Sequence, residues 1–207
     1  MLTTESYRLD DALDDITAAI DALDTRLADL QSSIDDEDSE GGGESGDEVR
    51  DLVEQLEARR DRLTFQQHGL QWQRDEEDWG GDTELVLGAL TAGEEAIKNR
   101  AVPERAGRDE RVLWLLAAAT IKAPYADNRA RDDRLTESVV EANFQGLAGT
   151  GIHPGFRQWL EAQVNSLGVP SESGNRSGTS SPATGSSGTS QSERDSTTSS
   201  SSDSPTA

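Results

Sequence analysis

Residues 9–34 read LDDALDDITAAIDALDTRLADLQSSI, and this stretch decides the fold of the chain. Its large apolar residues alternate in steps of four and three without a break, which is a heptad seam. The seam consists of Leu9, Leu13, Ile16, Ile20, Leu23, Leu27, Leu30 and Ile34. Because a helix with so narrow an apolar stripe cannot bury it alone, it must pair with another helix. The seam predicts a helix over residues 5–34 and is our candidate partner-binding site.

A second helical arm follows an acidic, glycine-rich segment, residues 35–47, which we expect not to be helical. Apolar residues then recur every seven positions up to about residue 74: Val49, Leu56, Leu63 and Leu70. In the second row of this stripe, Arg59 and Gln66 indicate either loose pairing or a polar layer that sets the register. Two matched arms around a loop predict an antiparallel coiled-coil hairpin over residues 1–76. A parallel homodimer formed by the first helix is the alternative.

Residues 77–168 read as a small helical bundle. Thr91 and Glu94 form a capping-box pattern that predicts a helix running to about Arg100. The apolar stretch 112–122 predicts a buried central helix, and the spacing of apolar residues over 135–147 predicts another. Residues 84–90 fit either a short strand or a helical turn.

The last predicted helix opens with Pro154 in its first turn and ends at Gly168. Residues 169–207 are rich in Ser, Thr and Gly and almost without aliphatic side chains, so we expect a disordered tail. The predicted fold class is therefore mainly α. It has three parts: a coiled-coil hairpin (1–76), a helical domain (77–168) and the tail.

The charge of the chain is strongly negative, at −22 from 41 acidic and 19 basic residues, and only two of the basic residues are lysines. This composition is typical of extreme halophiles, because molar salt shortens the screening length to about 3 Å and relieves self-repulsion. The alternative is an acidic, partly disordered mesophilic protein. The richest basic stretches, 100–111 and 129–134, are interleaved with acids, which argues against nucleic-acid binding.

The sequence contains little that points to chemistry. There is no cysteine, His68 and His153 are the only histidines, and no catalytic or phosphate-binding motif is present. We therefore expect no enzymatic activity, no cofactor and no metal site. The acids of residues 36–47 approximate the spacing of a calcium loop, but a solvated loop is the default interpretation. No signal peptide or membrane span is visible, which predicts an intracellular protein.

Several short motifs occur in a suggestive order along the second region: LTAGEEAI (90–97), LWLLAAAT (113–120), FQGL (144–147), HPGF (153–156) and WLEAQV (159–164). This order of short helices followed by a low-complexity tail resembles the tail assembly chaperones of tailed viruses. The resemblance implies a non-enzymatic assembly protein of a haloarchaeal tailed virus or provirus, working in the host cytoplasm. Its partner would be a helical tape-measure protein. The alternative function is a coiled-coil scaffolding protein that homo-oligomerises.

Overall fold

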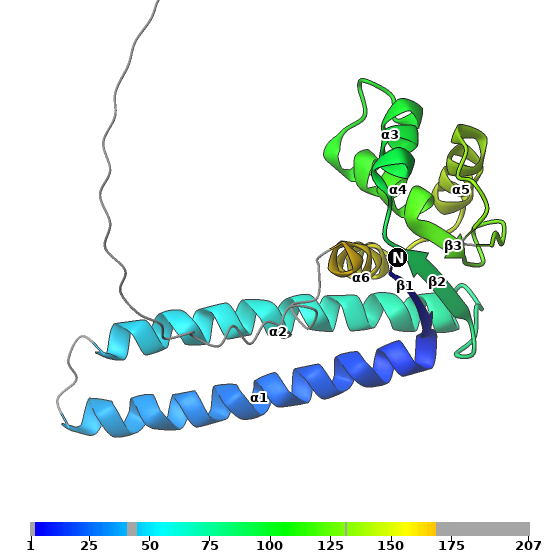
Figure 1. The fold of residues 1–207 in the computed structure, drawn as a ribbon. Helices are drawn as coiled ribbons and strands as arrows, with labels where there is room; N and C mark the ends of the chain where they lie inside the picture. The colour runs from blue at the N-terminus through cyan, green and yellow to red at the C-terminus, as the bar shows by residue number, and fades with distance from the viewer. Residues whose placement is uncertain (1–2, 41–44, 131, 169–207) are drawn as a thin grey trace, which may run out of the picture. The chain divides into compact units, whose positions relative to one another are not determined.

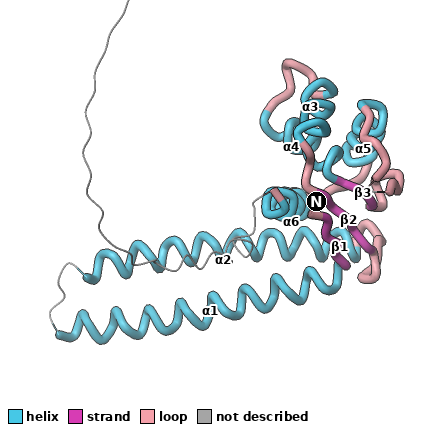
Figure 2. Tube along the Cα trace, in the orientation of Figure 1, coloured by secondary structure: helices cyan, strands magenta, loops and turns pink. Residues whose placement is uncertain are grey.

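The computed structural model describes residues 3–40, 45–130 and 132–168, and within them the chain is mainly helical, as predicted. A small three-stranded sheet, which the sequence did not predict as such, accompanies the helices (Figures 1 and 2). In chain order the elements are β1 (Thr4–Arg8), α1 (Leu9–Glu40), α2 (Ser45–Asp75), β2 (Glu84–Gly88), α3 (Ala92–Ala101), α4 (Arg108–Ala119), β3 (Thr120–Lys122), α5 (Glu137–Gly149) and α6 (Pro154–Leu167).

The sheet corrects two predicted helix boundaries. Its strand order is β1-β2-β3 with both pairs antiparallel, so the ambiguous segment 84–90 supplies the central strand. Residues 5–8, predicted as the start of the first helix, pair instead with β2, and α1 begins at Leu9. Residues 120–122, predicted as the end of the central helix, form β3. Leu85 and Leu87 are fully buried, so pairing on both sides of β2 closes the core around them.

Helices α1 and α2 lie side by side and run antiparallel (Figure 1). Both are longer than expected, because α1 continues to Glu40 and α2 begins at Ser45. The expectation of a non-helical segment over 35–47 was therefore wrong for 35–40 and 45–47. Each added residue extends an existing helix by one hydrogen bond, which outweighs the weak propensity of the acids. Residues 41–44, and the side chains of the calcium-like segment, lie outside the described residues.

The predicted helix caps of the second region are confirmed. The Thr91 hydroxyl accepts a hydrogen bond from the Glu94 N–H at 3.1 Å, and Glu94 Oε2 accepts from the Thr91 N–H at 2.8 Å. Pro154 opens α6 and Gly168 caps its end. The N-cap of α6 was not predicted: His153 Nδ1 accepts from the Gly155 N–H at 3.0 Å.

A continuous apolar core draws on both parts of the chain. Leu9 and Leu70 come from α1 and α2, whereas Leu87, Leu116 and Phe156 come from β2, α4 and α6, and all five are fully buried. The hairpin and the helical region therefore share a core at one end of α1 and α2. The boundary at 76/77 stays a prediction, and the predicted tail, 169–207, lies outside the described residues.

Candidate interaction surface

The structure places the eight seam residues on the side of α1 that packs chiefly against α2. Buried are Leu9, Leu13, Ile16, Leu23 and Leu27; partly buried are Ile20, Leu30 and Ile34. Much of the candidate partner-binding seam is therefore covered within the chain. A partner can reach only the part of the seam that the hairpin leaves open.

Polar contacts between α1 and α2 fix a single antiparallel register. Three pairs join the helices: Asp10 Oδ1 and Arg74 Nη1 at 3.2 Å, Thr17 Oγ1 and Gln67 Nε2 at 2.8 Å, and Asp24 Oδ1 and Arg60 Nε at 2.5 Å. From one pair to the next, the contact moves seven residues forward along α1 and seven back along α2. The register therefore stays constant over at least two heptads, on one edge of the helix pair.

The polar layer expected in the second arm is present in part. Gln66 is buried, as a layer inside the seam requires, but Arg59 is exposed. Gln73, one heptad after Gln66, is fully buried, and its Oε1 accepts a hydrogen bond from the His153 N–H at 2.8 Å. This amide thus ties α2 to the start of α6, a role that sequence reasoning missed.

Helix α6 crosses α2 with the two backbones in direct contact. A Cβ added to Gly69 would lie 2.0 Å from the backbone nitrogen of Phe156, and one added to Gly155 would lie 2.1 Å from the carbonyl oxygen of Phe65. No side chain fits at either position, so glycine is required by the close approach of the helices. The crossing covers the helix pair on the edge where Gly69 lies.

An aromatic patch borders this crossing and consists of Phe65, Trp72 and His153. Phe65 and Trp72 are the exposed large hydrophobic residues of the described chain, at 39% and 43% exposure. The ring of His153 contacts both, with centroid distances of 5.5 Å to Phe65 and 5.9 Å to Trp72. The patch offers aromatic surface, and it lies where α2 meets the start of α6.

The hairpin divides into two halves at the α6 crossing. The proximal half, residues 9–20 and 63–75, contributes Leu9, Leu13, Ile16 and Leu70 to the core. In the distal half, residues 21–40 and 45–62, only α1 and α2 are present among the described elements (Figure 1). Leu23 and Leu27 are buried there, whereas six other apolar side chains are partly exposed and form what we name the distal strip: Leu30, Ile34, Val49, Leu52, Val53 and Leu56.

Three arginines, Arg26, Arg59 and Arg62, lie at the start of the distal half and are named here the arginine cluster. The three arginines lie at about the same position along the hairpin, because Asp24 and Arg60 form an ion pair across the two helices. Arg26 is two residues from Asp24, and Arg59 and Arg62 are within two residues of Arg60. All three are exposed, and none forms an ion pair with another described residue. The chain has more than twice as many acids as bases, so a group of unpaired arginines is a distinctive feature.

A cleft of about 680 Å³ lies between α3 and residues 132–135. Several of its polar side chains have structural partners. Thr91 and Glu94 form the capping box, and Arg100 Nε pairs with Glu137 Oε1 at 2.7 Å. Apolar atoms of Ile97 and Leu135 complete the lining.

The remaining titratable groups with perturbed properties are also structural. Burial raises the pKa of Tyr125 to about 12, and its hydroxyl lies 2.9 Å from Thr120 Oγ1, so it stays neutral at ordinary pH. A hydrogen bond from Lys122 lowers the pKa of Glu84. Among the described residues, no group of three or more His, Asp or Glu side chains is placed to hold a metal ion.

Comparison with known proteins adds no relative. The chain matches no protein-family model, no curated protein and no solved structure. Among the helices described here, none combines the length and apolar character needed to cross a membrane. The hairpin, the distal strip and the arginine cluster are therefore the features of this chain that bear on its function.

Proposed function

We propose that this chain is a non-enzymatic assembly protein whose hairpin, α1 and α2, is an antiparallel coiled coil that binds a helical protein partner. The seven-residue step of the polar contacts on both helices supports the coiled coil, because helices that do not supercoil drift out of register. The heptad seam of α1 and the heptad recurrence on α2 support it as well.

The distal strip is the observation that carries the binding role. A helix with its own apolar stripe would complete this strip by lying along the two helices, which is the usual way that helices bind in grooves. The aromatic patch extends the apolar surface on the proximal half. Such a partner is recognised by the shape and periodicity of its apolar face, so no catalytic group is needed.

The acidic exterior fits work in concentrated salt. Asp11, Asp14, Asp15, Asp21 and Asp29 are exposed on α1, and they keep an apolar-binding helix pair in solution when molar salt screens their repulsion. We therefore propose that the protein is halophilic. For this reason its binding and stability should be measured in molar KCl.

The most specific form of the proposal is a tail assembly chaperone of a haloarchaeal tailed virus, acting in the host cytoplasm on a tape-measure-like protein. The resemblance over residues 90–168 supports this form, and so does the mainly helical fold of that region. Gene neighbourhood tests it. Adjacent genes for a tail tube and a tape measure are expected, and a neighbourhood without any tail gene contradicts the chaperone role.

A peptide-binding measurement tests the binding role directly. The probe is a fluorescent synthetic peptide with the sequence of residues 9–34, an apolar heptad helix, added to a dilute solution of the full chain. The anisotropy of the peptide is expected to rise on binding. A control peptide with Leu23→Asp and Leu27→Asp has the same length and no usable seam, so its anisotropy should stay flat. Equal behaviour of the two peptides would contradict helix binding.

A further inference from the structure

We infer that the distal half of the hairpin binds a second copy of this chain, so that the two hairpins form a four-helix arrangement. The inference rests on the proposed function, because it names the partner of the same surface. Two observations carry it: the position of the α6 crossing and the charges on the two helices.

The arginine cluster continues the edge that α6 covers. Gly69, where α6 crosses, and Arg62 are seven residues apart on α2, so they occupy equivalent heptad positions. The edge on which helix α6 seats in the proximal half is therefore uncovered in the distal half. Asp24 and Arg60 lie on the opposite edge, with the other polar pairs. An occupant of the uncovered edge extends an interface that already exists within the chain.

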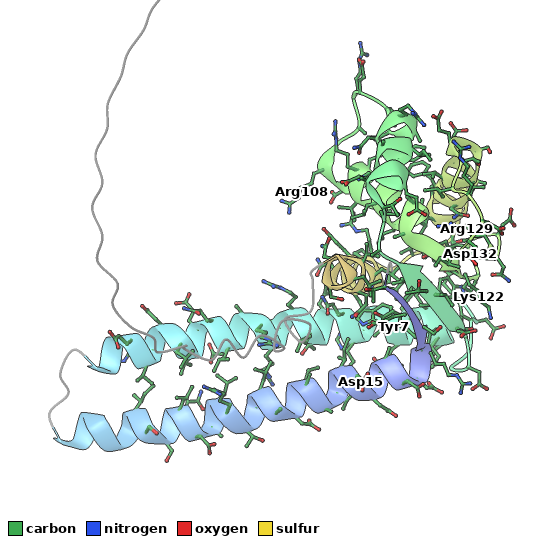
Figure 3. All side chains as sticks on the ribbon, viewed as in Figure 1. Tyr7, Asp15, Arg108, Lys122, Arg129 and Asp132 are labelled. Carbon is green, nitrogen blue, oxygen red and sulfur yellow. The ribbon has the colours of Figure 1, made fainter. Side chains whose placement is uncertain are left out.

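The charges of that edge fit the outer face of α1. The arginine cluster is unpaired within the described chain, whereas Asp21 and Asp29 lie exposed on the outer face of α1, with more acids nearer its start. Figure 3 shows one of these, Asp15, on the proximal part of α1. A second hairpin related by a two-fold axis brings the arginines of each copy to the acids of the other, so every contact is made twice. The existing α1–α2 contacts, Asp10 with Arg74 and Asp24 with Arg60, already use this pairing of acids with arginines.

The test measures the mass of the full chain in molar KCl by size-exclusion chromatography with light scattering. We expect twice the chain mass of 22.3 kDa for the wild type. Arg59→Glu with Arg62→Glu should shift the chain toward monomer, raising the dimer dissociation constant at least tenfold. The matched control is Arg105→Glu with Arg108→Glu, an equal charge change; Figure 3 shows Arg108 beside α4, away from the hairpin.

Helicity measured by circular dichroism must be unchanged in the variants, which separates loss of the dimer from loss of the fold. A wild type that stays monomeric overturns the inference, as does a dimer that the Arg59→Glu with Arg62→Glu variant leaves intact. A wild-type chain that is monomeric but still binds the peptide of residues 9–34 contradicts only the binding of a second copy and is consistent with the proposed function. A variant-sensitive dimer that does not bind the peptide supports the second copy and contradicts binding of an isolated heptad helix.

Discussion

The two halves of the hairpin share one heptad pattern but differ in how completely it is buried. In the proximal half Leu9 and Leu70 are inaccessible to solvent, whereas in the distal half Leu30 and Leu56 are only partly buried. The difference comes from α6 and the sheet, which cover the helix pair at one end only. The heptad seam therefore determines which two helices pair. Whether their apolar side chains are buried in a core or stay partly exposed depends on a third element that packs against the pair.

The largest expected effect compares equivalent seam positions of α2. Leu70→Ala removes a fully buried side chain from the core and should lower the free energy of unfolding by about 2–5 kcal/mol. Leu56→Ala, two heptads away, removes a partly exposed side chain and should cost roughly 1 kcal/mol. Urea unfolding followed by circular dichroism in molar KCl measures both. Equal losses would mean that the two halves are buried alike.

The α6 crossing provides the second test. Gly69→Ala places a Cβ against backbone atoms of Gly155 and Phe156, which cannot move aside as a flexible side chain would, and should cost about 1–3 kcal/mol or more. Gly149→Ala on α5 meets nothing within 4 Å and should be neutral or stabilise by about 0.5–1 kcal/mol. If both variants have the wild-type midpoint, the close crossing is absent.

A third comparison uses two glutamines of α2. Gln73→Ala removes a fully buried side chain that accepts a hydrogen bond from the partly buried His153 N–H, and should cost about 1–3 kcal/mol. Gln67→Ala removes only an exposed hydrogen bond to Thr17 and should cost less than about 1 kcal/mol. The same denaturant titration ranks them. A reversed order would contradict the role assigned to Gln73 at the α6 crossing.

The smallest expected effect is a pH dependence in the sheet that closes the proximal half. Lys122 Nζ lies 2.6 Å from Glu84 Oε2 and lowers the pKa of that carboxyl (Figure 3 labels Lys122). Because the pKa of this carboxyl is lower in the folded state than in the unfolded state, the pair stabilises the folded state at pH values above the usual carboxyl pKa. This contribution is lost as the pH falls through the folded-state pKa. Glu84→Gln should therefore be slightly less stable than wild type at neutral pH and equal to it in acid. A stability difference that persists in acid contradicts the assignment to this pair.

Local sequence patterns predicted the features that depend on neighbours a few residues away. The long helix over residues 9–34, the capping box of Thr91 and the first-turn position of Pro154 are all local, and the structure bears them out. The same patterns located the two long helices, α1 and α2. They could not say how far the seam is covered, because that depends on α6.

Features that depend on distant segments were missed. Residues 4–8, TESYR, contain no apolar alternation, and they form a strand only because β2, some 80 residues later, offers an edge. Residues 120–122 continue an apolar run that a helix would bury equally well, so only the sheet distinguishes β3. Gly69 and Gln73 resemble ordinary helix-surface residues until α6 is placed on them.

The α6 crossing also determines when the proximal half of the hairpin can be covered during synthesis of the chain. Helix α2 ends at Asp75, but α6, which covers it, ends at Leu167, so roughly 90 more residues must be added before the proximal half is closed. At about 5–20 residues per second, the nascent hairpin spends several seconds with its most apolar end uncovered on the ribosome. Over that interval the acids of α1 are the main protection against aggregation with neighbouring chains. Slow translation of α3 to α6 would lengthen this exposure, and soluble yield should fall with it.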